Sequence, residues 1–197
     1  LGNFDLWQII GLNIIILSSM NIFRKQYHKN KHIHVFLSLG SNQNAMENLQ
    51  GGIERLKKEF KLRQLSSLYK TKDVKERGDS ADFFNQVAEI EVDIPYTILR
   101  SQLKSIESDF GRETGNKKNV PLDLDILTYN NDVFYHGEKQ IPDPNLIKYS
   151  YIAVPLAEIA PDFRHPANGK SIDEIIVNIN DKNTVQKVNE VENGFES

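Results

Sequence analysis

The stretch VPLDLDIL at residues 120–127 constrains the fold more than any other part of the chain. Its aliphatic residues alternate with Asp123 and Asp125, and a period of two is typical of a half-buried strand. Successive side chains on a strand point to opposite faces, so the aliphatic side chains should enter a core while both carboxylates emerge on the other face. Two such carboxylates repel each other, and a hard divalent cation with oxygen ligands removes that repulsion. A solvated acidic face explains the same pattern, and the D-x-D motif taken alone favours that plainer interpretation.

Length and composition predict one globular domain with appendages. The chain has 197 residues, 39% of them hydrophobic and 26% charged, which is enough to bury a core. A net charge of −3 provides no overall positive field, so nucleic acid is not an expected partner. The sequence contains no cysteine, which excludes disulfides, thiol nucleophiles and zinc–thiolate sites and permits a reducing compartment. We expect a cytoplasmic monomer with small-molecule partners.

Residues 1–31 do not follow the pattern of the rest of the chain. An apolar stretch at residues 6–17 is too short for a bilayer span, which needs about 20 apolar residues. Asp5 precedes this stretch and basic residues begin only at Arg24, whereas a secretory signal places its basic region first. We interpret this segment as an atypical extension and a basic spacer without a stable membrane span, and a weak membrane-associated helix is the minority alternative. Met20 is a candidate start, which would make the residues before it translated upstream sequence.

Hydrophobic periodicity predicts an α+β domain over residues 32–179. Alternating apolar residues indicate strands, and apolar residues spaced by three and four indicate helices. In chain order they predict a strand at 33–39, a helix at 44–61, strands at 64–70 and 83–92, a helix at 95–110 and the strand at 120–127. This β-α-β-β-α-β order indicates a ferredoxin-like antiparallel sheet with both helices on one face. C-terminal additions follow, including a last helix after a capping box at Ser171, and residues 180–197 form a polar, loose tail.

Two features of the predicted domain go beyond periodicity. The charged loop at residues 71–82 is longer than a hairpin turn needs, and long loops in compact domains are usually functional or disordered. Gly51-Gly52 lies inside the first helix, where each Gly costs roughly 1 kcal/mol relative to Ala. Close packing against a neighbouring element would explain this pair.

Short segments spread along the domain occur in an order that resembles one enzyme family. They are Leu39-Gly40-Ser41-Asn42, Tyr69-Lys70-Thr71, Phe83-Phe84-Asn85, Ile106-Glu107 with Gly111-Arg112, Leu122-Asp123-Leu124-Asp125-Ile126-Leu127 and Val154-Pro155-Leu156-Ala157-Glu158-Ile159-Ala160-Pro161. Together, over residues 35–166, they resemble 6-hydroxymethyl-7,8-dihydropterin pyrophosphokinase, an enzyme of the folate pathway. Each segment is weak alone, but this order on this topology is specific, and it makes the solvated acidic strand the minority interpretation.

The resemblance implies a metal-dependent transfer reaction. A pyrophosphoryl group would pass from the co-substrate ATP to the hydroxymethyl oxygen of the pterin, and AMP would be released. Asp123 and Asp125 would hold two Mg²⁺ ions that bridge the triphosphate and the attacking oxygen. The chain has no G-x-x-x-x-G-K-[ST] loop, so side chains and metal would have to hold the phosphates instead.

The resemblance also implies a set of pterin-binding side chains. Thr71 and Asn85 would hydrogen-bond the pterin edge, with Ser41 and Asn42 nearby. Tyr151 matches an aromatic position that stacks on the ring, where an offset aromatic face is favourable. A strand-end cap and ordinary packing are the plainer interpretations of Asn85 and Tyr151.

On the nucleotide side, the resemblance implies roles for one acidic residue and for several cations. Glu107 matches a residue that lies near the nucleotide, and Arg112 matches one that acts with the two aspartates in catalysis. Lys117 and Lys118 would bind ATP as point charges, although Lys lacks the planar fork of Arg. A solvated loop explains this lysine pair equally well.

Four positions depart from the family pattern. Val120 stands where an Arg is expected, Asp143 where the family has a His, Tyr149 where it has another Arg, and Lys72 where a Pro is common. The metal ligands are therefore kept while phosphate binding is thinned. Two hypotheses remain: a working or slowed pyrophosphokinase, and a divergent paralogue that binds pterin or nucleotide with little or no turnover. An RNA-binding module is more remote, because it requires basic and aromatic residues where this sheet offers two carboxylates.

Overall fold

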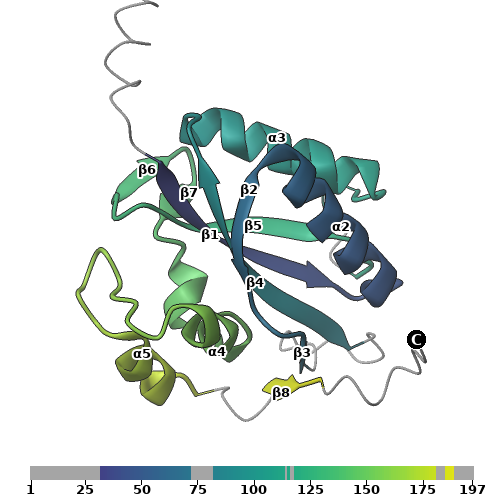
Figure 1. Ribbon diagram of the computed structural model, residues 1–197. Helices are drawn as coiled ribbons and strands as arrows, with labels where there is room; N and C mark the ends of the chain where they lie inside the picture. The colour runs from purple at the N-terminus through teal and green to yellow at the C-terminus, as the bar shows by residue number, and fades with distance from the viewer. Residues whose placement is uncertain (1–31, 72–81, 114, 116–117, 181–184, 189–197) are drawn as a thin grey trace, which may run out of the picture. The chain divides into compact units, whose positions relative to one another are not determined.

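The computed structural model describes residues 32–71, 82–113, 115, 118–180 and 185–188. Figure 1 shows a mixed fold in which helices pack on an antiparallel sheet. In chain order the elements are β1 (Ile33–Ser41), α2 (Ala45–Glu59), β2 (Lys61–Leu65), β3 (Tyr69–Thr71), β4 (Phe83–Val92), α3 (Tyr96–Asp109), β5 (Asp123–Tyr129), β6 (Phe134–His136), β7 (Lys139–Ile141), η1 (Pro144–Ile147), α4 (Ser150–Ile159), α5 (Ile172–Asn178) and β8 (Val185–Lys187). The predictions for residues 1–31 and for most of the loop at 71–82 lie outside the described residues.

The main sheet has the strand order β5-β1-β4-β3-β8, and β2 pairs with β4. The single strand expected at residues 64–70 is wrong, because β2 and β3 are separate strands that pair with successive parts of β4. Ser66 interrupts the ladder between them. Its hydroxyl, rather than a backbone carbonyl, accepts the Val87 N–H at 2.9 Å, and its carbonyl accepts the Gln86 side-chain amide at 2.9 Å.

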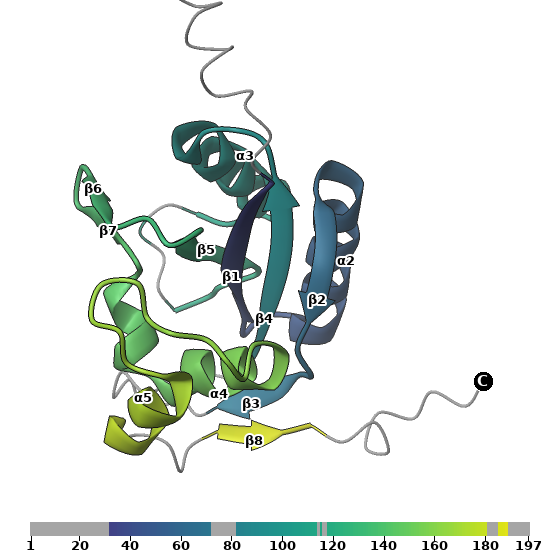
Figure 2. The same cartoon turned by 60° about the vertical axis from the view of Figure 1, so that its left-hand side comes forward.

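The aliphatic face of β5 enters the core, as the alternation predicts. Leu122, Leu124 and Ile126 are buried together with apolar side chains of α2 and α3. On the opposite face, Leu127 belongs to a second buried cluster with residues of α4 and α5. The two helices of the predicted motif, α2 and α3, lie on one face as expected, and the C-terminal helices α4 and α5 lie on the other (Figure 2).

The glycine pair inside α2 marks a close approach between elements. A Cβ atom on Gly51 would lie 2.8 Å from Cε1 of Phe110, and a Cβ atom on Gly52 would lie 2.9 Å from Cδ2 of Leu122. Both distances are shorter than a normal carbon–carbon contact. The missing side chains allow α2 to pack closely against the end of α3 and the segment that leads into β5, which offsets the cost in helix propensity.

Part of the predicted loose tail is ordered as β8. This strand pairs antiparallel with β3, so that Lys187 lies opposite Tyr69 and Val185 opposite Thr71. The Lys187 ammonium also lies 3.0 Å from Oε1 of Glu158 on α4. These backbone and ion-pair partners are distant in sequence, which is why local composition did not indicate them.

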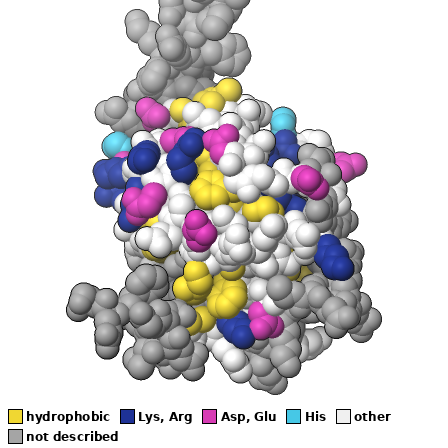
Figure 3. Space-filling view, turned by 90° about the vertical axis from the view of Figure 1, so that its right-hand side faces the viewer, with side chains coloured by type: hydrophobic (Ala, Val, Ile, Leu, Met, Phe, Trp, Pro, Cys, Tyr) yellow, Lys and Arg dark blue, Asp and Glu magenta, His cyan; other side chains and the backbone are white. Residues whose placement is uncertain are grey.

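The described surface shows no single-sign field on the face that Figure 3 displays. Basic and acidic side chains are interspersed there, and apolar side chains gather near the middle of the face. Within the described residues, none of the helices is long and apolar enough to cross a membrane.

Candidate functional site

One row of residues crosses the sheet and carries most of the predicted site. Asp123 lies opposite Gly40, Gly40 lies opposite Asn85, and Asn85 lies opposite Tyr69. Residues directly opposite each other in antiparallel strands share a face, so this row points to one side of the sheet. The side is that of α4, because the Tyr69 hydroxyl bonds Glu158 of that helix at 2.9 Å. Gly40 leaves the middle of the row without a side chain.

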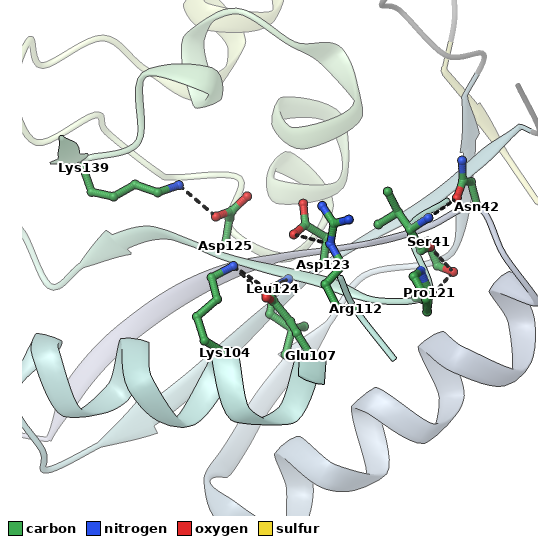
Figure 4. Close-up of polar contacts among 11 residues, drawn as sticks. Ser41, Asn42, Lys104, Glu107, Arg112, Pro121, Asp123, Leu124, Asp125 and Lys139 are labelled. Atoms are coloured by element: carbon green, nitrogen blue, oxygen red, sulfur yellow. Dashed lines mark hydrogen bonds and ion pairs between the residues drawn. The ribbon is translucent and has the colours of Figure 1, made fainter. Parts of the chain in front are cut away.

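The two aspartates of β5 emerge on this face together, as predicted (Figure 4). Their side chains are half-buried, with exposed fractions of 37% for Asp123 and 33% for Asp125. Burial, followed by the charge of Asp125, raises the pKa of Asp123 above its ordinary value. The cations Lys104, Arg112 and Lys139 offset part of this effect. Burial and the repulsion from Asp125 therefore disfavour the charged form of Asp123, which a further cation would stabilise.

Two cations lie beside these aspartates. The Nε atom of Arg112 is 3.9 Å from Oδ1 of Asp123, which places this predicted catalytic residue at the site. The Nζ atom of Lys139 is 3.2 Å from Oδ1 of Asp125. Burial alone would lower the pKa of Lys139, but the nearby carboxylates, chiefly Asp125, raise it overall. Sequence reasoning missed Lys139, because no local pattern links the hairpin of β6 and β7 to Asp125.

Glu107 lies under the edge of β5 rather than in the open part of the site. Only 3% of it is exposed, and its carboxylate accepts the Leu124 N–H at 2.7 Å and the Lys104 ammonium at 2.6 and 2.8 Å. Burial raises the pKa of Glu107, and these two donors oppose the rise. Glu107 thus joins α3 to the strand that carries the aspartates, and a contact with nucleotide would compete with these bonds. The spacing of three residues between Lys104 and Glu107 on one helix is the sequence pattern from which their ion pair could have been predicted.

Ser41 and Asn42 hold the segment that leads into β5. The Ser41 hydroxyl is fully buried and donates to the Pro121 carbonyl at 2.7 Å. Asn42 accepts the Val120 N–H at 2.7 Å through its side chain and donates its own N–H back to the Val120 carbonyl at 3.0 Å. β5 consequently begins at Asp123 rather than at residue 120, since this segment bonds the end of β1 through side chains. Pterin binding by Ser41 and Asn42 remains a prediction.

The structure brings Thr71 and Asn85 together. The Asn85 side-chain amide donates to the Thr71 hydroxyl at 3.0 Å, and both residues are almost fully buried. Tyr151, at the start of α4, stacks on Tyr149 with ring centroids 5.1 Å apart and an interplanar angle of 22°. Burial raises the pKa of the Tyr151 phenol, and the charges of nearby carboxylates, including Asp125, raise it further. Tyr151 is therefore a half-buried ring held against Tyr149 at the start of α4.

Asp143 is a third carboxylate near the β5 pair. It is buried, and it caps η1 by accepting the Asn145 N–H at 2.7 Å. Burial and the charge of Asp125 raise its pKa, while the Asn145 bond and nearby lysines lower it. Of the predicted lysine pair, Lys117 lies outside the described residues, and the Lys118 carbonyl accepts the Asn42 side-chain amide at 2.8 Å.

The donor set suits a cation that arrives with an anionic ligand. Within the described residues, no group of three or more His, Cys, Asp or Glu side chains is placed to hold a metal ion. Mg²⁺ is usually bound by one or two carboxylates together with water and substrate phosphates rather than by an all-protein cage. Asp123 and Asp125, which are half-exposed and repel each other, fit that mode of binding.

Comparisons with known proteins agree on one family. A sequence model of 7,8-dihydro-6-hydroxymethylpterin-pyrophosphokinase (HPPK) matches residues 36–161. The 2-amino-4-hydroxy-6-hydroxymethyldihydropteridine pyrophosphokinase of Haemophilus influenzae is 32% identical over 148 residues, which are 73% of this chain and 91% of that protein. Folic acid synthesis protein FOL1 of Dictyostelium discoideum is 30% identical over 135 residues, or 67% of this chain and 20% of that protein. The chain thus spans about a fifth of the length of this relative.

Solved structures show the same fold. Plasmodium falciparum HPPK-DHPS A437G with pteroate superposes with a TM-score of 0.61, at 14% identity, over 81% of this chain and 47% of that chain. At such low identity the likeness supports the fold alone. It assigns no role to any residue of this chain.

Proposed function

The chain belongs to the HPPK family, and on that premise we propose that it transfers a pyrophosphoryl group from ATP to 6-hydroxymethyl-7,8-dihydropterin in folate biosynthesis. The observation that carries the proposal is the row across the sheet. It places Asp123 and Asn85 on one face, two inter-strand spacings of about 4.8 Å apart, with Gly40 between them. That separation is roughly the length of a fused two-ring system with a side arm. A pterin that bonds Asn85 can therefore direct its hydroxymethyl group toward the aspartates.

In the proposed reaction the hydroxymethyl oxygen attacks the β-phosphorus of ATP. A new oxygen–phosphorus bond forms, the bond from the β-phosphorus to the oxygen shared with the α-phosphate breaks, and AMP leaves while the hydroxyl proton passes to solvent. When bound, Mg²⁺ supplies positive charge to the triphosphate and favours an in-line geometry. Asp123 and Asp125 would hold two such ions, and Arg112 would contribute a further positive charge beside Asp123.

The pterin end depends on groups that are already arranged. Asn85 and Thr71 are held in contact, and a pterin edge would meet an amide and a hydroxyl with restricted geometry. Such a site discriminates strongly, because a ligand that lacks the matching groups leaves buried polar atoms unpaired. Tyr151 would lie against the ring from α4.

The alternative, a paralogue that binds its ligands with little turnover, is not favoured. This alternative depends on positions where the family pattern has a cationic residue and this chain does not. At two of these positions the structure shows a packed side chain instead. Val120 is 4% exposed, and Tyr149 stacks on Tyr151. Against this stand the family match and the retained aspartate pair.

We also infer that the sheet is a ferredoxin-like variant. If β2 and β3 are counted as one interrupted strand, the order is fourth, first, third and second, with antiparallel neighbours throughout. The functional domain would then comprise residues 32–179 with β8 added at the edge. A cytoplasmic monomer remains an expectation from composition.

The test is an AMP-release assay with the purified chain, the dihydropterin, ATP and Mg²⁺. We expect AMP only when all three are present, and we expect pterin analogues without the hydroxymethyl group to give none. If the chain binds both ligands in calorimetry but releases no AMP above background, the binding-only paralogue replaces this proposal.

A further inference from the structure

Lys139 is the cation that lies nearest to Asp125, and it comes from outside the main sheet. It begins β7, in a two-stranded sheet formed by β6 and β7, and extends its ammonium to within 3.2 Å of Oδ1 of Asp125 (Figure 4). The Lys139 side chain is 43% exposed. An ion pair this accessible to water contributes little to stability, so the ammonium can leave Asp125 at low cost.

Charged side chains from β5, from α3 and from the residue that caps η1 lie around Lys139. Three carboxylates act on it, those of Asp125, Asp143 and Asp123. Among the neighbouring cations, Lys104 already bonds both oxygens of Glu107, and Arg112 lies beside Asp123 rather than Asp125. Arg100 lines the same pockets as Lys139, but the ion pair with Asp125 is made by Lys139, which therefore offsets that charge when no ligand is bound.

There is room for this side chain to occupy a second position. Lys139 lines two adjoining pockets, an inner one with Asp125 and Arg100, and an outer one with His136 and Asn145. The four-carbon stem of lysine is flexible, and its ammonium is a point charge that can change partners without the geometric demands of Arg.

We propose that Lys139 is a tethered cation that holds the place of the metal at Asp125 and moves to the polyphosphate when Mg·ATP binds. This inference rests on the proposed function. A divalent cation at Asp125 and the ammonium at the same oxygen repel each other, so one must leave. The polyphosphate brings the negative charge that the displaced ammonium requires, within reach of the same stem. Lys139 thus competes with a bare metal ion and cooperates with the metal–nucleotide complex.

The test exploits these opposite signs, which a merely structural ion pair would not produce. Lys139→Met removes the charge and keeps most of the length. Binding of Mn²⁺ alone, followed by the electron paramagnetic resonance of the free ion, should become about three- to tenfold tighter in this variant, because a competing charge has gone. Affinity for Mg·ADP, measured by calorimetry, should become weaker by a similar factor. Lys139→Arg should restore the nucleotide affinity in part.

Lys170→Met provides a matched control on an exposed loop between α4 and α5, and both affinities should stay at the wild-type values. Thermal unfolding confirms that each variant is folded. The inference is overturned if Lys139→Met leaves Mn²⁺ affinity unchanged or shifts both affinities in the same direction. Asp125→Asn separates this result from a failure of the proposed function. If that variant binds Mn²⁺ as tightly as the wild type, the metal site itself is wrong, and both proposals fall.

Discussion

The two ends of the row across the sheet differ in how completely they are built. At the β3 and β4 end, Thr71 and Asn85 are buried and bonded to each other, and Tyr69 is fastened to α4 through Glu158. At the β5 end, Asp123 and Asp125 are half-exposed and repel each other, and each lies beside one cation, Arg112 or Lys139. On the proposed function, the first end would bind a neutral, planar ligand with groups that are already hydrogen-bonded, and the second would be completed by the charges of its ligand.

This difference has an energetic reason. A buried polar group that loses its partner costs about 1–3 kcal/mol, so a buried recognition surface must be satisfied before the ligand arrives. Half-exposed charges are solvated by water, so the absence of a ligand costs them little free energy. Substitutions at the two ends should therefore affect stability and ligand affinity differently.

The largest effect should come from Asp125→Asn. Removing one metal-facing charge should slow AMP formation by about 10²- to 10³-fold, by analogy with the loss of one group that stabilises a transition state. The melting temperature should stay equal or rise, because repulsion with Asp123 is relieved. Initial rates and a thermal scan measure both quantities. A lower melting temperature with a normal rate would reverse the assignment of this end as functional rather than structural.

Glu107→Ala should affect stability more than ligand affinity. It leaves the Leu124 N–H without its acceptor at a buried edge, which should lower the free energy of unfolding by about 2–3 kcal/mol. Chemical denaturation monitored by circular dichroism gives this value. Glu47→Ala, at an exposed position of α2, is the control and should cost less than about 1 kcal/mol. If both variants lose the same free energy of unfolding, the hydrogen bond from the Leu124 N–H adds no measurable stability.

Asn85→Ala should separate the two ligands. Pterin affinity should fall by about 1–3 kcal/mol, since the amide that meets the pterin edge is gone, while ATP affinity should barely change. Isothermal titration of each ligand measures this, and Asn178→Ala on α5 controls for the loss of an exposed amide. Parallel losses for pterin and ATP would indicate partial unfolding and would remove the distinction between the two ends.

The smallest effect should be a change in acid sensitivity in Glu158→Gln. Although burial acts to raise the pKa of Glu158, bonds from Ser67, Lys187 and Tyr69 lower it below the ordinary 4.5. A depressed carboxylate pKa adds stability above the unfolded value, and this is lost as pH falls through the folded value. The wild type should thus lose more melting temperature than the variant as pH falls below about 4.5. If the melting temperatures of both proteins fall equally as pH is lowered, the bonds of Glu158 do not stabilise the contact of α4 with β3 and β8.

The sequence predicted the parts of this molecule that local pattern controls. The alternation around Asp123 correctly placed three aliphatic side chains in the core and both carboxylates on the other face. The close packing expected at Gly51-Gly52 was confirmed by the approach of Phe110 and Leu122. These features depend on neighbours within a few residues or on an unusual residue type that needs an explanation.

The parts that were missed depend on partners far along the chain. A serine within an apolar stretch gave no sign that Ser66 would accept a ladder N–H and divide the strand. Lys139 became a site residue only because a short hairpin carries it to Asp125. Ser41 and Asn42 matched a family position, but the structure also shows them bonding the segment before β5, which a motif cannot reveal.

The pairing of β8 with β3 has a consequence for how the protein behaves at high concentration. An uncovered strand offers a row of unsatisfied N–H and C=O groups that recruits a strand from another molecule. Residues 185–188 cover that row on β3, and the Val188 N–H extends the cover by donating to the Leu68 carbonyl at 2.9 Å. We therefore expect a chain cut before Val185 to form intermolecular sheets, visible as light scattering that grows with concentration. Because β8 is itself an edge strand of only three residues, and short edge strands recruit other chains less readily, we expect its pairing with β3 to reduce aggregation.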